Sequence, residues 1–165
     1  MKVLVLSDSH SSLYFMRQCI ERTKPDAVIH LGDYFEDGAA MAEAYPHIRF
    51  HLLPGNCDAY RVAPWQDQIL SYSIGGVPFY MTHGHKHRVK MTLSFLLSDA
   101  RASKAAAVLY GHTHQAVCHR VDEGLWVLNP GSCGYGGGSA GLIEIKEEKI
   151  VSCRIIRQEN LEEFV

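Results

Sequence analysis

Short apolar runs alternate with amphipathic segments along the first half of the chain. Val3–Leu6 and Ala27–Leu31 are rich in β-branched residues and too short for helices, which predicts buried strands. Between them, apolar residues recur at helical spacing over Leu13–Ile20, and Pro25 closes that segment. A weaker helical pattern covers about Asp37–Ala44. Strands and helices therefore alternate in this half of the protein.

The second half is richer in predicted strands. Ile69–Ile74 and Val77–Thr82 flank Gly75-Gly76, which is a two-residue signal for a hairpin. A mostly helical pattern covers Val89–Ala102. The other predicted strands are Ile48–Leu53, Ala105–Tyr110, Ala116–Val121, Leu125–Leu128, Leu142–Ile145 and Ile150–Ile156. This order favours an α/β sandwich over a fold that is doubly wound throughout, and 165 residues suit a single domain spanning residues 1–165.

The composition is that of a globular protein, and it argues against several classes of function. Hydrophobic residues make up 47% and the net charge is −2, so no basic face for a nucleic-acid duplex is predicted. The five cysteines are scattered without a CxxC pair, which favours reduced thiols over a disulfide framework or a zinc finger. The N-terminal apolar run is too short for a signal peptide, and no stretch approaches the ~20 apolar residues that span a bilayer. We therefore expect a cytoplasmic protein with no membrane partner.

Histidine changes this picture, because most of the ten histidines lie where apolar runs give way to polar residues. Polar clusters follow predicted strands at Asp8-Ser9-His10, Gly32-Asp33, Gly55-Asn56-Cys57-Asp58, His83-Gly84-His85, Gly111-His112-Thr113-His114 and Asn129-Pro130-Gly131-Ser132. In α/β folds, loops at the carboxyl ends of strands converge on one crevice. Asp, Asn and His suit divalent first-row metals such as Mn, Fe, Ni and Zn. Alternate residues of an extended segment point the same way, so Asp8 and His10 can reach one ion together. The turn at Gly111 lets the two histidines that follow serve two different ions.

Each cluster also has an ordinary interpretation. DxH is often a helix cap followed by an incidental histidine, GD and NPGS are common turns, and HGH or GHTH alone is more often an exposed loop. The combination argues against these interpretations, because all six clusters would have to arise by accident, each after an apolar strand. The histidines outside the clusters are expected to be partly exposed polar residues: His30, His47, His51, His87 and His119.

The ordered motifs DxH, GD, GN, H and GHTH resemble those of the calcineurin-like metallophosphoesterase superfamily. The shorter forms GNCD, THGH (Thr82–His85), GHTH and NPGS are similar to those of its small YfcE-type phosphodiesterase branch. The resemblance runs from Asp8 to Ser132. It implies a four-layer αββα sandwich with a dimetal site at one edge of the two sheets. It also implies an enzyme that hydrolyses small phosphate esters, most of all phosphodiesters, through a metal-bridging hydroxide.

Matching the motifs position by position implies a complete set of metal ligands. The implied ligands of the first ion are Asp8, His10 and His114. Asp33 would bridge both ions. The implied ligands of the second ion are Asn56, His83 and His112, which together with Asp33 form the implied catalytic group. Two divalent ions ~3.5–4 Å apart can activate water and clamp the phosphoryl oxygens during in-line attack. Four imidazoles favour Mn²⁺ or Ni²⁺ over a hard ion such as Mg²⁺, with Fe or Zn as alternatives.

One position departs from the broader superfamily, many of whose members have a histidine where this chain has Cys57. The resemblance assigns that histidine to the transition state or the leaving group. A thiol is a weak donor, so Cys57 is expected to be a bystander and His85 to support a neighbouring ligand. Other side chains that could meet substrate or wall a pocket are Arg61, Lys86, Tyr34, Tyr60 and Trp65, for which surface charge or local packing is the default. Cys133–Ser139 is rich in glycine and predicts a flexible loop.

A second class of function stays open, which is a non-catalytic protein-interaction scaffold. A retromer subunit of the same fold presents surfaces to partner proteins, and its metal motif is eroded at positions that are intact here. The intact motif favours an enzyme with a small phosphate-ester substrate. The sequence leaves open which ester is the substrate, which metal is used and whether the chain forms a homo-oligomer.

Overall fold

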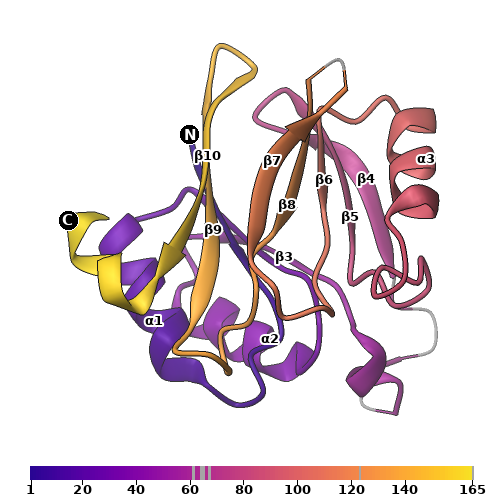
Figure 1. Ribbon diagram of the computed structural model, residues 1–165. Coiled ribbons are helices and arrows are strands. Elements are labelled where there is room, and N and C mark those ends of the chain that lie inside the picture. Colours follow the sequence, from indigo (N-terminus) through magenta and orange to yellow (C-terminus); the bar gives the residue numbers. More distant parts are fainter. Residues whose placement is uncertain (61, 64–65, 67, 123, 165) are drawn as a thin grey trace.

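The computed structural model describes residues 1–60, 62–63, 66, 68–122 and 124–164. Within these residues, two five-stranded sheets face each other and helices flank both outer sides (Figure 1). The helices are α1 (Leu13–Thr23), α2 (Phe35–Ala44), α3 (Ser94–Ala102) and the short 3-10 helices η1 (Asn56–Asp58) and η2 (Gln158–Phe164). The four-layer α/β sandwich that the sequence predicts is confirmed.

The first sheet combines strands from both ends of the chain, in the order β10-β9-β1-β2-β3. Its strands are β1 (Lys2–Leu6), β2 (Ala27–His30), β3 (Arg49–Leu52), β9 (Ser139–Lys146) and β10 (Lys149–Arg157). β1, β2 and β3 are parallel, whereas β9 runs antiparallel to both β1 and β10. The loops after the three parallel strands therefore share one edge of the sheet.

The second sheet has the order β4-β5-β6-β8-β7. Its strands are β4 (Ile69–Ile74), β5 (Val77–Thr82), β6 (Ala107–Leu109), β7 (Val117–Val121) and β8 (Leu125–Asn129). β5, β6 and β8 are parallel, and the edge strands β4 and β7 are antiparallel to their neighbours. Gly75 and Gly76 both have positive φ and close the β4–β5 hairpin at the predicted residues.

Successive apolar side chains of a strand point to opposite faces of its sheet and pack in different parts of the core. On β1, Val3 and Val5 pack into the core between the sheets, whereas Leu4 and Leu6 pack on the side of α1 and α2. α3 covers the outer face of the second sheet and buries Leu96. No helix in the described part of the chain is long and apolar enough to cross a membrane.

The helix expected over Val89–Ala102 begins only at Ser94, so its first turn was predicted wrongly. The residues before it form turns in which Met91 and Thr92 donate backbone hydrogen bonds to Arg88. Arg88 has φ of 54°, and a left-handed residue interrupts an α-helix. Met91 lies in these turns, and its side chain is 83% exposed.

Candidate metal centre

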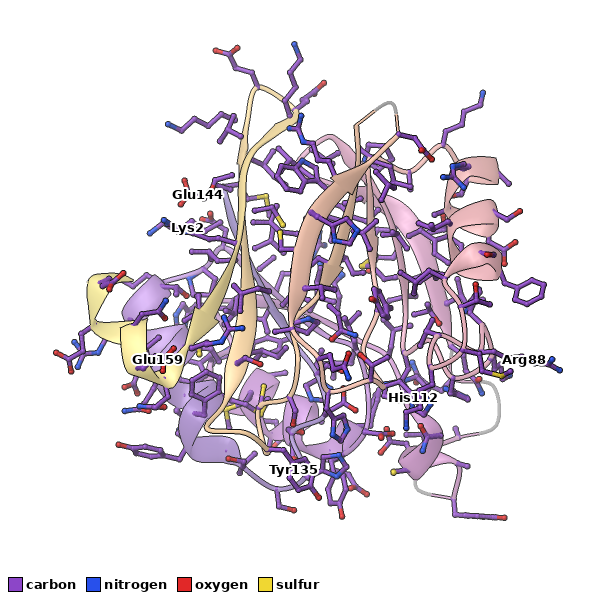
Figure 2. All side chains as sticks on the ribbon, in the orientation of Figure 1. Lys2, Arg88, His112, Tyr135, Glu144 and Glu159 are labelled. Carbon is purple, nitrogen blue, oxygen red and sulfur yellow. The ribbon has the colours of Figure 1, made fainter. Side chains whose placement is uncertain are left out.

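The seven candidate ligands lie in loops at the carboxyl ends of parallel strands, where sites form in α/β folds. The first sheet contributes, after β1, β2 and β3, the residues Asp8, His10, Asp33 and Asn56. The second sheet contributes, after β5 and β6, the residues His83, His112 and His114. His112 marks this end of the sandwich in Figure 2, and Tyr135 lies at the same end. The centre is therefore built jointly by both sheets.

One group of four side chains has ligand atoms that all lie within 4.8 Å of one another: Asp8, His10, Asp33 and His114. Oδ1 of Asp8 is 3.0 Å from Nε2 of His114. This pair does not have the geometry of a hydrogen bond, so Oδ1 of Asp8, like Nε2 of His10, is buried and forms no hydrogen bond among the described residues. Buried polar atoms are costly when they are left unpaired, and a carboxylate oxygen beside imidazole nitrogens suits a divalent ion. This group fits a metal ion.

A second group meets the same distance condition and consists of Asp33, His83 and His112. Nε2 of His83 lies 3.5 Å from Oδ1 of Asp33 and 3.1 Å from Oδ1 of Asn56. The rings of His83 and His112 pack edge to face with centroids 5.1 Å apart. Asn56 thus lies within reach of the second group, and Asp33 belongs to both groups.

The backbone at most of these residues adopts a conformation that is rare for L-amino acids. φ is positive at five of the candidate ligands: Asp8 (53°), His10 (45°), Asp33 (57°), His112 (68°) and His114 (58°). Each such residue costs on the order of 1–3 kcal/mol and persists only where its surroundings hold it. Strain of this kind gathers at functional sites, which supports a functional role for this end of the sandwich.

Two glycines allow the ligand loops to approach each other closely. A Cβ at Gly55 would lie 2.1 Å from Oδ1 of Asp33, and a Cβ at Gly111 would lie 2.1 Å from Oγ of Ser7. Both distances are far below van der Waals contact. The glycine in the GN motif and the glycine in the GHTH motif are thus required by packing.

Hydrogen bonds hold two of the candidate ligands in orientation. Nδ1 of His83 donates to the backbone carbonyl of Leu31 at 2.9 Å, which leaves Nε2 free to face the centre. The backbone N–H of Cys57 donates to Oδ1 of Asp33 at 2.9 Å. Cys57 belongs to the GNCD motif and Leu31 directly precedes the GD motif, so residues within and next to the motifs orient the candidate ligands.

Asp58, the last residue of the GNCD motif, supports the same loops, and its role was not predicted. Its buried carboxylate accepts backbone hydrogen bonds from Tyr34, Phe35 and Gly55. It therefore ties the loop after β2 to the loop after β3. A buried acidic residue next to a ligand motif is the sequence signal that could have pointed to this role.

The NPGS motif supports the ligand loops from the other side of the centre. Asn129 donates to the backbone carbonyl of Gly111 and to Oγ1 of Thr113, each at 2.9 Å. Ser132 donates to the backbone carbonyl of Asp8 at 2.7 Å. The motif therefore connects β8 to the loops after β1 and β6, and these partners were not predicted from the sequence.

The surroundings of two candidate ligands, His112 and Asp33, lower their pKa values. Burial, followed by the proximity of His83, lowers the pKa of His112 to about 4. Burial alone would raise the pKa of Asp33, but His83 and the hydrogen bonds from Cys57 outweigh it and hold this pKa below its ordinary value. At neutral pH His112 is neutral and Asp33 is ionised, as metal ligands must be.

The glycine-rich segment Cys133–Ser139 packs against the first group of ligands, a contact that the sequence did not predict. Tyr135 stacks on His114 with centroids 5.3 Å apart and lies 4.9 Å from the ring of His10. The backbone N–H of Cys133 donates to the carbonyl of Ser7 at 3.0 Å. Tyr34, for which local packing was the default expectation, has its ring centroid 5.0 Å from that of His10. Aromatic rings thus flank His10.

Of the other residues that the sequence suggested for support or substrate contact, some lie beside the candidate ligands and others are exposed. His85 lies beside the second group, with ring centroids 5.5 Å from His83 and 6.2 Å from His112. The Cys57 side chain is exposed next to Asn56. Lys86 and Tyr60 are exposed, and Arg61 and Trp65 lie outside the described residues.

Two histidines that were expected to be partly exposed are buried, so that prediction was wrong for them. His30 is fully buried, and its Nε2 lies 3.1 Å from Oγ of Ser9 beneath the centre. His87 is also buried and lies within hydrogen-bond distance of Tyr80 and Asp99. Both have polar partners that the apolar pattern does not reveal.

The chain belongs to the calcineurin-like phosphoesterase superfamily, whose domain model matches residues 1–148. Phosphodiesterase MJ0936 of Methanocaldococcus jannaschii is 30% identical over an alignment that covers 90% of this chain and 96% of that protein. The resemblance that the motifs indicate is therefore confirmed, and it lies with small phosphodiesterases.

Solved structures agree with this assignment. A conserved uncharacterized protein of Streptococcus pneumoniae, a predicted phosphoesterase, superposes with a TM-score of 0.75 at 25% identity and covers 96% of this chain and 90% of its own. Wild-type Vps29 of Entamoeba histolytica complexed with Zn²⁺ superposes with a TM-score of 0.72 at 21% identity, covering 95% of this chain and 98% of its own. The second likeness shows the fold alone.

Proposed function

We propose that this protein is a phosphodiesterase that requires two divalent metal ions and acts on small phosphate esters. The observation that carries the proposal is the pair of ligand groups that share Asp33, since a carboxylate with two oxygens can serve two cations at once. The family membership and the similarity to phosphodiesterase MJ0936 support the same reaction class.

Each candidate ligand has a distinct task in this proposal. Asp8, His10 and His114 would hold the first ion. Asn56, His83 and His112 would hold the second, and Asp33 would contact both. When bound, the two ions supply charge that activates a water molecule and neutralises the phosphoryl oxygens.

The protein's own groups supply orientation and selectivity for the metal. The hydrogen bond to Leu31 fixes the His83 ring, and the hydrogen bond from Cys57 fixes one oxygen of Asp33. The amide of Asn56 adds an oxygen ligand without charge, and its NH₂ group can donate to a phosphate oxygen. Four imidazoles favour Mn²⁺ or Ni²⁺ over Mg²⁺.

The test is a substrate panel run on metal-free protein that has been reconstituted separately with Mn, Ni, Fe, Zn and Mg. Activated phosphodiesters such as bis-p-nitrophenyl phosphate should be hydrolysed only by the reconstituted protein, and best with Mn or Ni. His114→Ala should lose metal and turnover. His119→Ala removes an exposed histidine outside the centre and is the matched control. Undiminished turnover after verified removal of metal would rule out the proposal.

A non-catalytic protein-interaction scaffold is the second candidate, since Vps29 shares this fold. That structure contains Zn²⁺, so metal binding alone does not separate the two candidates. Turnover does: a scaffold would hold metal at full occupancy without hydrolysing any ester of the panel.

A further inference from the structure

Two cysteines that lie far apart in the sequence meet at the side of the sandwich. Cys118 lies on β7 and Cys153 on β10, 35 residues further along the chain. Sγ of Cys118 donates a hydrogen bond to Sγ of Cys153 at 2.9 Å. A disulfide bond is about 2.05 Å long, so the sulfur atoms would have to approach by only about 0.9 Å to become bonded.

The two cysteines lie on edge strands of different sheets. β7 is an edge strand of the second sheet and β10 is an edge strand of the first, so the two sulfur atoms join different sheets. Both side chains are partly exposed and pack against the core between the sheets. At the opposite side of the sandwich, the edge strands β3 and β4 are joined by a contact between His51 and the Tyr72 hydroxyl. A side-chain contact thus joins the two sheets at each lateral edge of the sandwich.

We propose that Cys118 and Cys153 are an oxidation site, and that they form a reversible disulfide that cross-links the two sheets. With a peroxide, one thiolate attacks the O–O bond and becomes a sulfenic acid, and the second thiol displaces water from it. The two thiols together lose two electrons and two protons, and hydrogen peroxide is reduced to two molecules of water. With a small disulfide such as oxidised glutathione, the same two-electron oxidation releases two molecules of the reduced thiol.

The two thiols change each other's pKa through the hydrogen bond that they share. Once Cys118 has lost its proton, the Cys153 thiol can donate a hydrogen bond to the thiolate, and this lowers the pKa of Cys118. The hydrogen bond with Cys118, followed by burial, raises the pKa of Cys153. The lowered pKa of Cys118 favours a thiolate within this pair, which is the form that attacks an oxidant.

The other cysteines differ from this pair. Cys19 and Cys133 are buried, and burial raises the pKa of both thiols, that of Cys133 to about 12. Cys57 is exposed but has no thiol partner within hydrogen-bond distance among the described residues. Disulfide formation within one chain is therefore expected at Cys118 and Cys153.

The test treats the full chain with hydrogen peroxide and, separately, with oxidised glutathione, and maps the product under non-reducing conditions. The intact mass should fall by about 2 Da, since two hydrogens are lost. Trypsin cleaves after Lys104, Arg120, Lys149 and Arg154, so residues 105–120 should be recovered linked to residues 150–154. Dithiothreitol should reverse the link. Because a disulfide constrains the unfolded chain, the unfolding temperature should rise by about 5–10 °C on oxidation.

Single variants separate this disulfide from other thiol chemistry. Cys118→Ser and Cys153→Ser should each abolish the linked peptide and the rise in unfolding temperature, whereas Cys57→Ser should retain both. The peptide map of the unmutated protein stands even if a serine variant folds poorly. The proposal is overturned if Cys118 and Cys153 still react fully with an alkylating agent after oxidation, or if the linked peptides contain a different pair of cysteines.

Discussion

Asp33 is the residue on which the two ligand groups depend, because its carboxylate is within reach of both. Replacing it with Asn keeps the size but removes the charge that offsets two cations. Changes to residues that merely orient ligands already cost about 10–100-fold in affinity or activity. We expect Asp33→Asn to lower turnover by more than about 100-fold, and more than His10→Ala does, with metal content falling to one ion or none. Retention of two ions and most of the rate would show that Asp33 does not bridge.

Cys57 provides a second test at the scale of a single residue. Partial desolvation, followed by the hydrogen bond with Asp33, raises the pKa of this thiol to about 11, which makes it a poor proton donor. A general acid contributes about 10²–10⁴-fold, mainly for poor leaving groups. The rate should therefore fall steeply as the leaving group changes from nitrophenolate to alkoxide.

Two substitutions at Cys57 should differ in their effect on this dependence. Cys57→His should flatten it, since an imidazole can protonate the leaving group, and the exposed side chain leaves room for a larger one. Cys57→Ala should change little at equal metal occupancy. If Cys57→Ala abolishes turnover while both metals stay bound, the thiol takes part in catalysis.

At the scale of elements, the loop between β6 and His112 depends on Gly111. A Cβ at this position would lie 2.1 Å from Oγ of Ser7 and 2.8 Å from Oδ2 of Asp8. Gly111→Ala should therefore push the loop after β6 away from the loop after β1, at a cost of about 1–3 kcal/mol in the free energy of unfolding. It should also lower metal content. Gly136→Ala adds a methyl group that meets no atom of the described residues within 4 Å. The φ of 65° strains an alanine there, so this variant should lose some stability but keep its metal content.

The strands were predicted well because each is a short apolar run bounded by polar or glycine residues. The β4–β5 hairpin, for example, begins and ends where the pattern places it. The pairing of β9 with β1 was not predictable, because residues more than 130 positions apart leave no local signal. The helix before Ser94 was predicted wrongly, since apolar spacing does not reveal the left-handed backbone at Arg88.

The candidate ligands were recognisable because metal chemistry uses few residue types at fixed motif positions. Their supports were not recognisable in the same way. The three backbone hydrogen bonds to Asp58 and the stacking of Tyr135 on His114 depend on how loops from different strands meet. Such contacts are set by tertiary packing, which the order of residues specifies only through the complete fold.

At the scale of the whole molecule, the burial of His30 should make the free energy of unfolding depend on pH. Burial lowers its pKa to about 4 despite the nearby carboxylates of Asp8 and Asp37, whereas an unfolded histidine titrates near 6.5. Between these two values the unfolded chain binds a proton that the folded protein does not bind. Stability should therefore fall as the pH drops from about 6.5 to 4, by up to about 1.4 kcal/mol per pH unit from this residue.

Chemical unfolding at several pH values in the presence of a chelator measures this contribution. His30→Gln has no group that titrates in this range, so its free energy of unfolding should fall less steeply over the same interval. An equal slope in both proteins would mean that other groups account for the acid sensitivity.

Because the candidate ligands come from loops between residues 8 and 114 and from both sheets, the candidate metal centre cannot form before most of the chain has folded. Closing such long loops is slow, and a contact that forms after the transition state changes the unfolding rate and leaves the folding rate alone. Stopped-flow refolding with Mn²⁺ and with a chelator should thus give folding rate constants within about two-fold, while unfolding slows markedly with Mn²⁺. Strong acceleration of refolding by the ion would mean that the metal organises the chain early. The protein would then bind metal while it folds, and not after folding is complete.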